Sequence, residues 1–113
     1  MPQYLISFND GDMTFPDEDF PEVARAARAV VQEARDAGVF VFAGGFGDPG
    51  KSTTVAVDGT VTDGPRANVK DFIGGFTIVD VPTRKDALDW AAKIAVACRC
   101  AQDVREFLSA PPR

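Results

Sequence analysis

The sequence predicts an α+β domain in which two helices cover one face of an antiparallel sheet. Two segments, 20–34 and 83–95, place apolar residues at helical spacing, and short apolar runs typical of strands flank each of them. Asp58-Gly59 lies between two β-branched stretches, which is the strongest short signal for a hairpin. A chain of 113 residues is also long enough for one domain with its own core.

The first half of the chain predicts a strand, a helix and a second strand. Residues 5–8 form the first short strand. An apolar stripe then predicts a helix that Gly38 is expected to end, and its members are Phe20, Val23, Ala24, Ala27, Val30, Val31 and Ala34. Residues 39–43 are apolar throughout, so we expect them to form a central strand.

The second half predicts the hairpin, a long strand, a second helix and a last strand. A turn at residues 63–66 follows the hairpin, and residues 72–81 form the long strand. Residues 83–86 match the [ST]-x-x-[DE] signal that begins a helix, and residues 101–108 form the last strand. The order fits either two β-α-β units around a hairpin insertion or the ferredoxin-like split β-α-β plan with that insertion.

The two central strands are apolar on both faces, although the helices can cover only one. In the earlier strand, alternation places Phe40 and Phe42 on one face and Val39 and Val41 on the other, and the later strand repeats this pattern. An uncovered apolar sheet face should meet a partner. We therefore expect a homodimer joined through sheet faces, because two-fold association is the commonest assembly.

Composition and charge exclude several classes of function. Twelve basic residues against seventeen acidic ones, with no basic cluster beyond Arg84-Lys85, predict no nucleic-acid partner. No apolar stretch approaches the ~20 residues of a membrane span, so we expect no membrane partner. Residues 1–4 lack the basic start of a signal peptide, so we expect a cytoplasmic protein. Cys98 and Cys100 are only two positions apart, so a disulfide between them would stabilise the fold very little and we expect reduced thiols. Because the chain has no His, we expect no metal, and we also expect no cofactor.

Residues Gly45 to Ser52 match the phosphate-binding pattern G-x-x-x-x-G-K-[ST]. A P-loop works because its Lys-Ser pair opens a helix, whose free amides and positive dipole end hold the phosphates. Here β-branched residues follow from Thr53 and turn at an Asp-Gly pair, which predicts a strand. A strand cannot direct several amides at a triphosphate. We therefore interpret the motif as a false positive, with Lys51 and Ser52 as solvated loop residues.

Five short motifs follow one another along the chain: Tyr4-Leu5-Ile6, Phe42-Ala43-Gly44-Gly45, Asp63-Gly64-Pro65, Gly74-Gly75-Phe76 and Asp86-Ala87-Leu88-Asp89-Trp90-Ala91. Through their order and spacing the chain resembles the YCII-related family, and within it the branch named for an Asp-Gly-Pro-Phe signature. The resemblance implies one domain built as a dimeric α+β barrel, with a core over about residues 3–108 and a short Pro-rich tail, 109–113. Arg66 stands where the signature has Phe.

The resemblance implies little about a reaction. The wider family has been regarded as enzymatic because of a His–Asp pair in a cleft, and this chain has no His. We therefore expect a small-ligand-binding or accessory module. One alternative is a cofactor-free enzyme in which a cleft carboxylate, Asp63 or Asp80, handles a proton on a small organic acid or lactone. Another is an accessory protein to a sigma-factor-type regulator, because the genes of some relatives lie beside such regulators.

Two repeated glycine pairs, Gly44-Gly45 and Gly74-Gly75, each precede a phenylalanine. Glycines inside strands mark bulges or a close approach of backbones. One interpretation is that the strands and a helix pack tightly at these positions. The other is a small cleft floored by bare backbone, whose amides could bind an oxyanion or a carboxylate.

The signature turn supplies the remaining candidates for a site. Asp63 either accepts hydrogen bonds from the amides of its turn or acts as a carboxylate at a pocket mouth, paired with Arg66 or Lys70, which suits a small polar ligand. Tyr4 could line a pocket between helix and sheet. The predicted ligand-binding residues are therefore Tyr4, Gly44, Gly45, Asp63, Arg66, Gly74 and Gly75.

Overall fold

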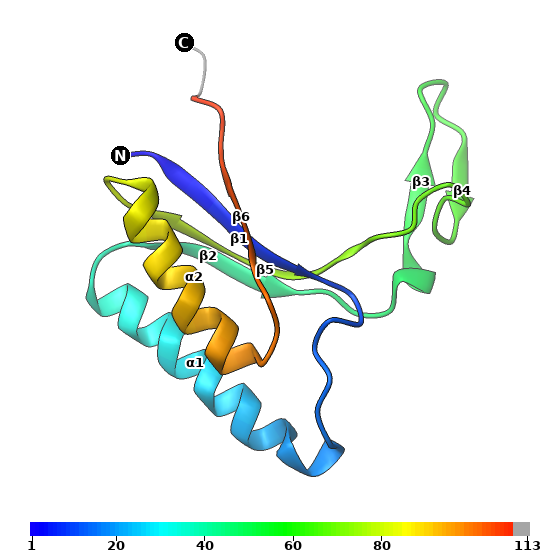
Figure 1. Cartoon of the computed structure of the whole chain (residues 1–113). Coiled ribbons are helices and arrows are strands. Elements are labelled where there is room, and N and C mark those ends of the chain that lie inside the picture. Colours follow the sequence, from blue (N-terminus) through cyan, green and yellow to red (C-terminus); the bar gives the residue numbers. More distant parts are fainter. Residues whose placement is uncertain (110–113) are drawn as a thin grey trace.

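The computed structural model describes residues 1–109, which form a four-stranded sheet, a small two-stranded sheet and two long helices (Figure 1). The elements are β1 (Gln3–Asn9), α1 (Phe20–Asp36), β2 (Phe40–Gly45), β3 (Thr53–Val55), β4 (Val61–Asp63), β5 (Ile73–Asp80), α2 (Arg84–Cys98) and β6 (Asp103–Glu106), with short 3-10 turns at Asp17–Asp19 and Pro49–Lys51. The predicted order of elements is confirmed, with boundaries moved by a few residues. Residues 110–113 of the predicted Pro-rich tail lie outside the described part.

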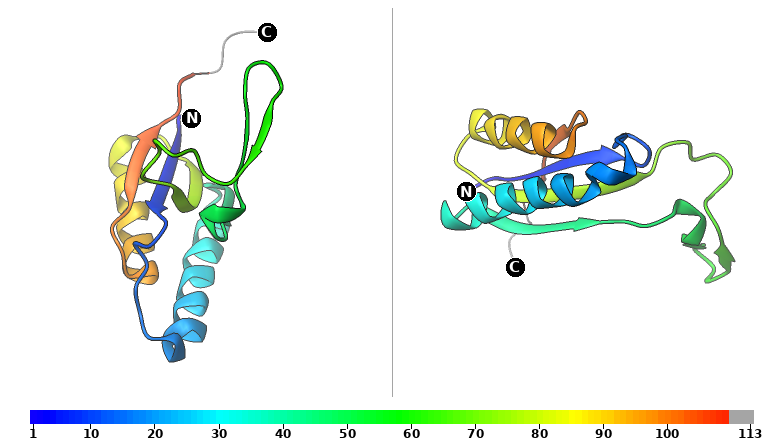
Figure 2. Two further views of the ribbon diagram at one scale, coloured as in Figure 1. Left: turned by 90° about the vertical axis from the view of Figure 1, so that its right-hand side faces the viewer. Right: turned by 90° about the horizontal axis from the view of Figure 1, so that it is seen from below.

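The main sheet has the strand order β2-β5-β1-β6, and each pair of neighbours is antiparallel. This order is the ferredoxin-like split β-α-β plan, which is the second of the two arrangements left open by the sequence. Helix α1 follows β1, helix α2 follows β5, and both helices lie on the same face of the sheet (Figure 2). The β3–β4 hairpin is inserted between β2 and β5, as predicted.

Both helices pack side by side on one face of the main sheet (Figure 2). Side chains from β1, β5 and α2 meet there in the buried core, which consists of Tyr4, Ile6, Val79, Val81, Ala87, Ala91, Ile94 and Cys98. In β5, the buried residues alternate with half-buried ones, so that Thr77 and Val79 face the helices and Phe76 and Ile78 face away. The predicted alternation in this strand is confirmed.

Within residues 1–109, no helix covers the other side of the main sheet, which we call the open face (Figure 2). It carries the apolar side chains of Leu5, Phe42, Phe76 and Ile78, which the registers of β1, β2 and β5 place on one side. The rings of Phe42 and Phe46 each lie 5.9 Å from the ring of Phe76. Phe42 is 58% exposed and Phe46 is 61% exposed. The expected uncovered apolar face is therefore present.

A bulge in β2 corrects one expectation about these faces. Phe40 pairs with Val79, whereas Phe42 pairs with the adjacent residue Ile78, so Val41 is an extra residue in β2. Facing partners in a ladder lie on the same side of a sheet. Phe40 therefore faces the helices and Phe42 lies on the open face. The prediction that both rings share one face is wrong, because the extra residue shifts the period-two pattern by one step.

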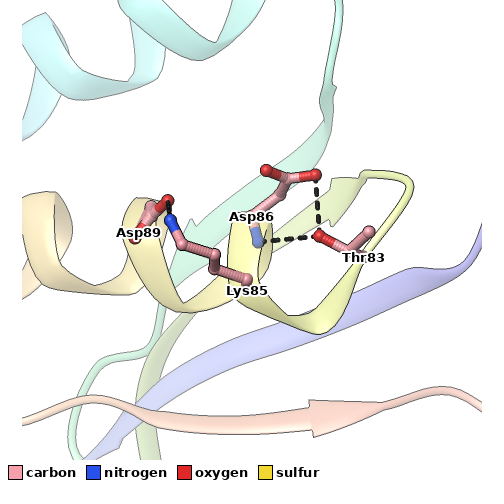
Figure 3. A network of polar contacts seen from close by, with 4 residues as sticks. All are labelled: Thr83, Lys85, Asp86 and Asp89. Atoms are coloured by element: carbon pink, nitrogen blue, oxygen red, sulfur yellow. Dashed lines mark hydrogen bonds and ion pairs between the residues drawn. The ribbon is translucent and has the colours of Figure 1, made fainter.

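The second helix begins at an N-cap threonine, Thr83 (Figure 3). The Asp86 amide donates a hydrogen bond to Thr83 Oγ1 at 3.2 Å, and the Thr83 hydroxyl donates to Asp86 Oδ2 at 2.9 Å. One turn later, Lys85 and Asp89 form an exposed ion pair at 3.0 Å. The helix start predicted from residues 83–86 is thus confirmed. This anchored start fixes the register with which α2 packs on the sheet.

The β3–β4 hairpin stands away from the main sheet as an arm (Figure 1). The Cα radius of gyration of 16.0 Å exceeds the roughly 13 Å expected for a compact domain of this length. The predicted turn is confirmed, since Gly59 has φ +90° and the Thr60 amide donates to Asp58 Oδ1 at 2.9 Å. The direction of the arm separates the signature turn at its base from the centre of the sheet.

Candidate functional site

The two predicted glycine pairs meet across β2 and β5, where Gly45 pairs with Gly75. A Cβ atom on Gly75 would lie only 2.7 Å from Cζ of Phe8, and one on Gly74 would lie 3.1 Å from the backbone nitrogen of Asp10. The Phe8 ring therefore lies directly over Gly75. The sequence left two interpretations of the glycine pairs open, tight packing or a cleft floored by backbone. At Gly74 and Gly75 the structure shows tight packing.

The other predicted site residues lie elsewhere. Tyr4 is buried beneath the helices, where burial, followed by the negative charge of Glu106, raises the pKa of its hydroxyl. Asp63 is exposed at the end of β4, and its Oδ1 accepts a hydrogen bond from the Thr53 hydroxyl at 3.3 Å. Arg66 is exposed in the segment that follows the arm. The predicted residues therefore do not form one constellation.

Amides of the phosphate-binding motif are already engaged in hydrogen bonds within the loop. The amides of Gly50, Lys51 and Ser52 donate to oxygens of Asp48 and Pro49 at 2.8, 3.0 and 2.9 Å. Strand β3 follows immediately, as predicted, in place of the helix that a P-loop requires. The loop therefore offers a triphosphate neither these amides nor the positive end of a helix dipole.

We expect ATP to bind no more tightly than the millimolar range, and we expect Lys51→Ala to leave that weak binding unchanged. The physical reason is that the loop amides already have internal acceptors, so the lysine would act as a single solvated charge. Isothermal titration calorimetry with Mg-ATP on both proteins measures this. Micromolar binding that Lys51→Ala abolishes would contradict the assignment.

A cleft of about 580 Å³ is lined by α1, the end of α2 and residues of β1, β2 and β5. This volume is within the range of about 300–1,000 Å³ that holds small organic ligands in proteins. Most of the lining is apolar and consists of Phe8, Met13, Ala27, Val30, Val31, Phe40, Ala43, Gly44, Phe76, Ile94 and Ala97. Among the predicted site residues, Gly44 alone lines this cleft.

Half of the polar side chains of the cleft, including both charged ones, come from α1. Arg28, Gln32 and Arg35 stand on one side of this helix, and the remaining polar lining residues are Thr77, Cys98 and Gln102. The Arg35 guanidinium lies 4.9 Å from the centre of the Phe40 ring. None of the lining residues in the described part of the chain is a carboxylate. The cleft is thus apolar inside and cationic along one edge.

The cysteine of the cleft is not an activated nucleophile. Cys98 and Cys100 are both free, as the sequence predicts. Burial, followed by the neighbouring Cys100 thiol, raises the pKa of Cys98, so the thiol stays protonated at neutral pH. Burial and then the Asp12 carboxylate likewise raise the pKa of Cys100, although Gln102 Nε2 donates to its Sγ at 3.5 Å. Neither thiol provides the thiolate that nucleophilic chemistry requires.

The carboxylates suggested for proton transfer also lie outside the cleft. Asp80 ends β5, where its Oδ1 is 3.7 Å from the N-terminal amine of Met1. Asp63 lies on the arm. In residues 1–109, no group of three or more His, Cys, Asp or Glu side chains is placed to hold a metal ion. Neither helix of this part is long and apolar enough to cross a membrane.

The fold and the cleft define a class: an α+β protein with a ferredoxin-like sheet, an inserted hairpin arm and an apolar cleft edged by arginines. The family model described as the YCII-related domain matches residues 4–107. The chain therefore belongs to the YCII-related family, which confirms the resemblance at the level of the family. No curated protein matches the chain significantly. The matched range includes both helices, both sheets and every residue that lines the cleft.

Proposed function

We propose that this YCII-related protein is a small-ligand-binding module whose site is the cleft between α1 and the main sheet. The observation that carries the proposal is the cleft itself, which has the volume and the largely apolar lining of ligand sites together with a few polar groups at its edge. Such polar groups fix the orientation of a ligand, and the apolar lining supplies most of the favourable free energy of binding.

An enzyme of the same fold is the rival proposal, and the chemistry of the cleft argues against it. General acid–base catalysis needs a titratable group within hydrogen-bond reach of the reacting proton. Asp63 and Asp80 do not line the cleft, the chain has no His, and burial keeps the Cys98 thiol protonated. Binding without chemistry is therefore the function that these residues support best.

The open face supports a second part of the proposal, a homodimer in which two main sheets pack face to face. Phe42 and Phe46 would otherwise keep large exposed rings in water beside Phe76. Monomeric proteins rarely expose contiguous apolar patches of this kind. Joining two identical open faces buries the patch on both chains with a single two-fold axis.

Finer assignments within the family rest on single features. We place the chain in the Asp-Gly-Pro-Phe branch because it carries Asp63-Gly64-Pro65, with a bend at Gly64 (φ +94°) where the chain leaves β4 at the base of the arm. Arg66 in the fourth position is the departure from that signature. The cytoplasm is the proposed compartment, and the two free cysteines support it, because thiols persist under reducing conditions.

The cleft is tested with naphthylethanol, a neutral probe with an apolar body, titrated by isothermal titration calorimetry. We expect saturable binding to the unmodified chain and at least about tenfold weaker binding to Ala43→Phe, because the new ring would project from β2 into the cleft. Ala27→Phe blocks the same cleft from α1. Val41→Phe is the matched control, since Val41 lies in the bulge and does not line the cleft.

Circular dichroism spectra and melting curves establish that each variant is folded before its binding is compared. Equal affinity of all four proteins would place the probe elsewhere on the molecule. That outcome, or an unmodified chain that binds no probe, would contradict the proposed function.

A further inference from the structure

We infer that the cleft selects an anionic ligand with an apolar body, such as a carboxylate attached to a ring or a hydrocarbon chain. This inference rests on the proposed function and adds a chemical class to it. Acidic residues outnumber basic ones by seventeen to twelve in this chain, yet the charged groups that line the cleft are two guanidiniums. The local charge of the cleft is therefore opposite to that of the whole protein.

The two guanidiniums belong to one side of one helix. Arg28 and Arg35 are seven residues apart, which is two turns or about 10 Å along α1. Val31, between them, also lines the cleft. Both arginines are exposed, so they stand at the mouth of the cleft and not in its interior. They form a cationic edge along the opening through which a ligand would enter.

Neither arginine forms an ion pair with a carboxylate of residues 1–109. Every ion pair within residues 1–109 uses another cation, namely the N-terminus, Lys85, Lys93 or Arg99. A guanidinium has five N–H donors and matches the two oxygens of a carboxylate in a fork geometry. Arg28 and Arg35 thus keep donors available for an anion from outside the chain.

Arg35 also contacts an aromatic ring of the cleft lining. Its guanidinium lies 4.9 Å from the centre of the Phe40 ring, which is itself a lining residue. A cation held over an aromatic face is attracted to the negative π-surface of that ring. The contact therefore holds the charge of Arg35 beside the opening, where it faces any ligand whose body enters the cleft.

The interior of the cleft determines the other half of the ligand. Phe8, Met13 and Ile94 present rings and aliphatic groups, and the lining has no carboxylate to repel an anion. An apolar body gains from leaving water in such a place. A carboxylate at the mouth stays partly hydrated, so it meets the guanidiniums without the large cost of full burial. A cationic ligand of the same shape would meet like charge.

Three probes that share one naphthyl body test the inference: naphthylacetate, naphthylethanol and naphthylethylamine. Isothermal titration calorimetry at low ionic strength should show the carboxylate binding about tenfold more tightly than the alcohol, with the amine weakest. Because the charges lie at the mouth, added NaCl should weaken the binding of naphthylacetate and leave that of naphthylethanol nearly unchanged.

Single substitutions of the two arginines test whether their charges cause the preference for a carboxylate. Arg28→Gln and Arg35→Gln should each reduce the preference for carboxylate over alcohol about three- to tenfold, since each removes one charge-assisted partner. Glutamine keeps the helix propensity of these exposed positions, so the fold is preserved. Arg25→Gln is the matched control, because Arg25 is an exposed arginine of α1 that does not line the cleft.

The outcomes separate the inference from the proposed function. Equal binding of naphthylacetate and naphthylethanol would overturn the anion preference and leave the cleft as a site for neutral ligands. A carboxylate preference that survives both arginine substitutions, or that Arg25→Gln removes, would also overturn it. Failure of all three probes to bind the unmodified chain would overturn both the inference and the proposed function.

Discussion

Replacing Phe42 with aspartate is expected to convert the proposed homodimer into single chains. The Phe42 side chain is 58% exposed in one chain, and its ring lies 5.9 Å from that of Phe76 on the open face. Burying a phenylalanine side chain stabilises by about 1.5–3 kcal/mol, and a two-fold interface loses this twice. A carboxylate held in an apolar interface adds a desolvation cost. The dissociation constant should therefore rise at least about hundredfold.

Size-exclusion chromatography with light scattering measures the result over a range of protein concentrations. Phe20→Asp is the matched control, because Phe20 begins α1 on the other layer of the molecule and is 62% exposed. We expect this control to keep the dimer. Dissociation by Phe20→Asp, or a Phe42→Asp protein that stays dimeric at low micromolar concentration, would contradict an interface on the open face.

Replacing Gly75 with alanine is expected to lower the free energy of unfolding by about 1–3 kcal/mol. The new methyl group would lie 2.7 Å from Cζ of Phe8 and 3.3 Å from the carbonyl oxygen of Gly44. The ring tip of Phe8 would have to shift, and the carbonyl, which belongs to the β2–β5 ladder, would have to give by a few tenths of an ångström. The close contact therefore cannot be relieved by one side chain alone.

Urea unfolding followed by the fluorescence of Trp90, the single tryptophan, measures this change at one fixed protein concentration. Gly47→Ala is the control, because a methyl group there would meet no heavy atom within 4 Å and the position has no left-handed φ. Its stability should change by less than about 0.5 kcal/mol. Equal midpoints for Gly75→Ala and Gly47→Ala would contradict the close packing of Phe8 on Gly75.

Much of the fold could be predicted because its determinants are local. The N-cap bond between Thr83 and Asp86 sets the start of α2 within four consecutive residues. The Asp58-Gly59 pair sets the hairpin turn in the same way. The β-branched residues after Ser52 predict a strand, and this local pattern alone argues against a phosphate-binding loop. The strand and the hydrogen bonds within the loop agree with it.

The bulge at Val41 could not be predicted, because a period-two pattern carries no mark of an extra residue when every position is apolar. Its effect is large, since it moves Phe42 from the helix side to the open face. The distance that separates Asp63 and Arg66 from the glycine pairs also could not be predicted, because it depends on how the arm is oriented relative to the main sheet. Local patterns fix the turn of the arm but not the direction in which the arm leaves the sheet.

The candidate site was the least predictable part, because its lining comes from both helices, three strands of the sheet and two loops. Gly44 was found through its doubled glycine, whereas the arginines were missed. One signal was present: Arg28, Gln32 and Arg35 follow one another at helical spacing on α1 beside its apolar stripe. Only the packing of that helix on the sheet shows that this edge borders a cleft.

Sedimentation equilibrium of the unmodified chain at micromolar concentration is the most direct test of whether the open face joins two copies. We expect a mass twice the 12.1 kDa of one chain, because the apolar face of each sheet is then buried against its equal. A stable mass of one chain across that concentration range would contradict the proposed assembly.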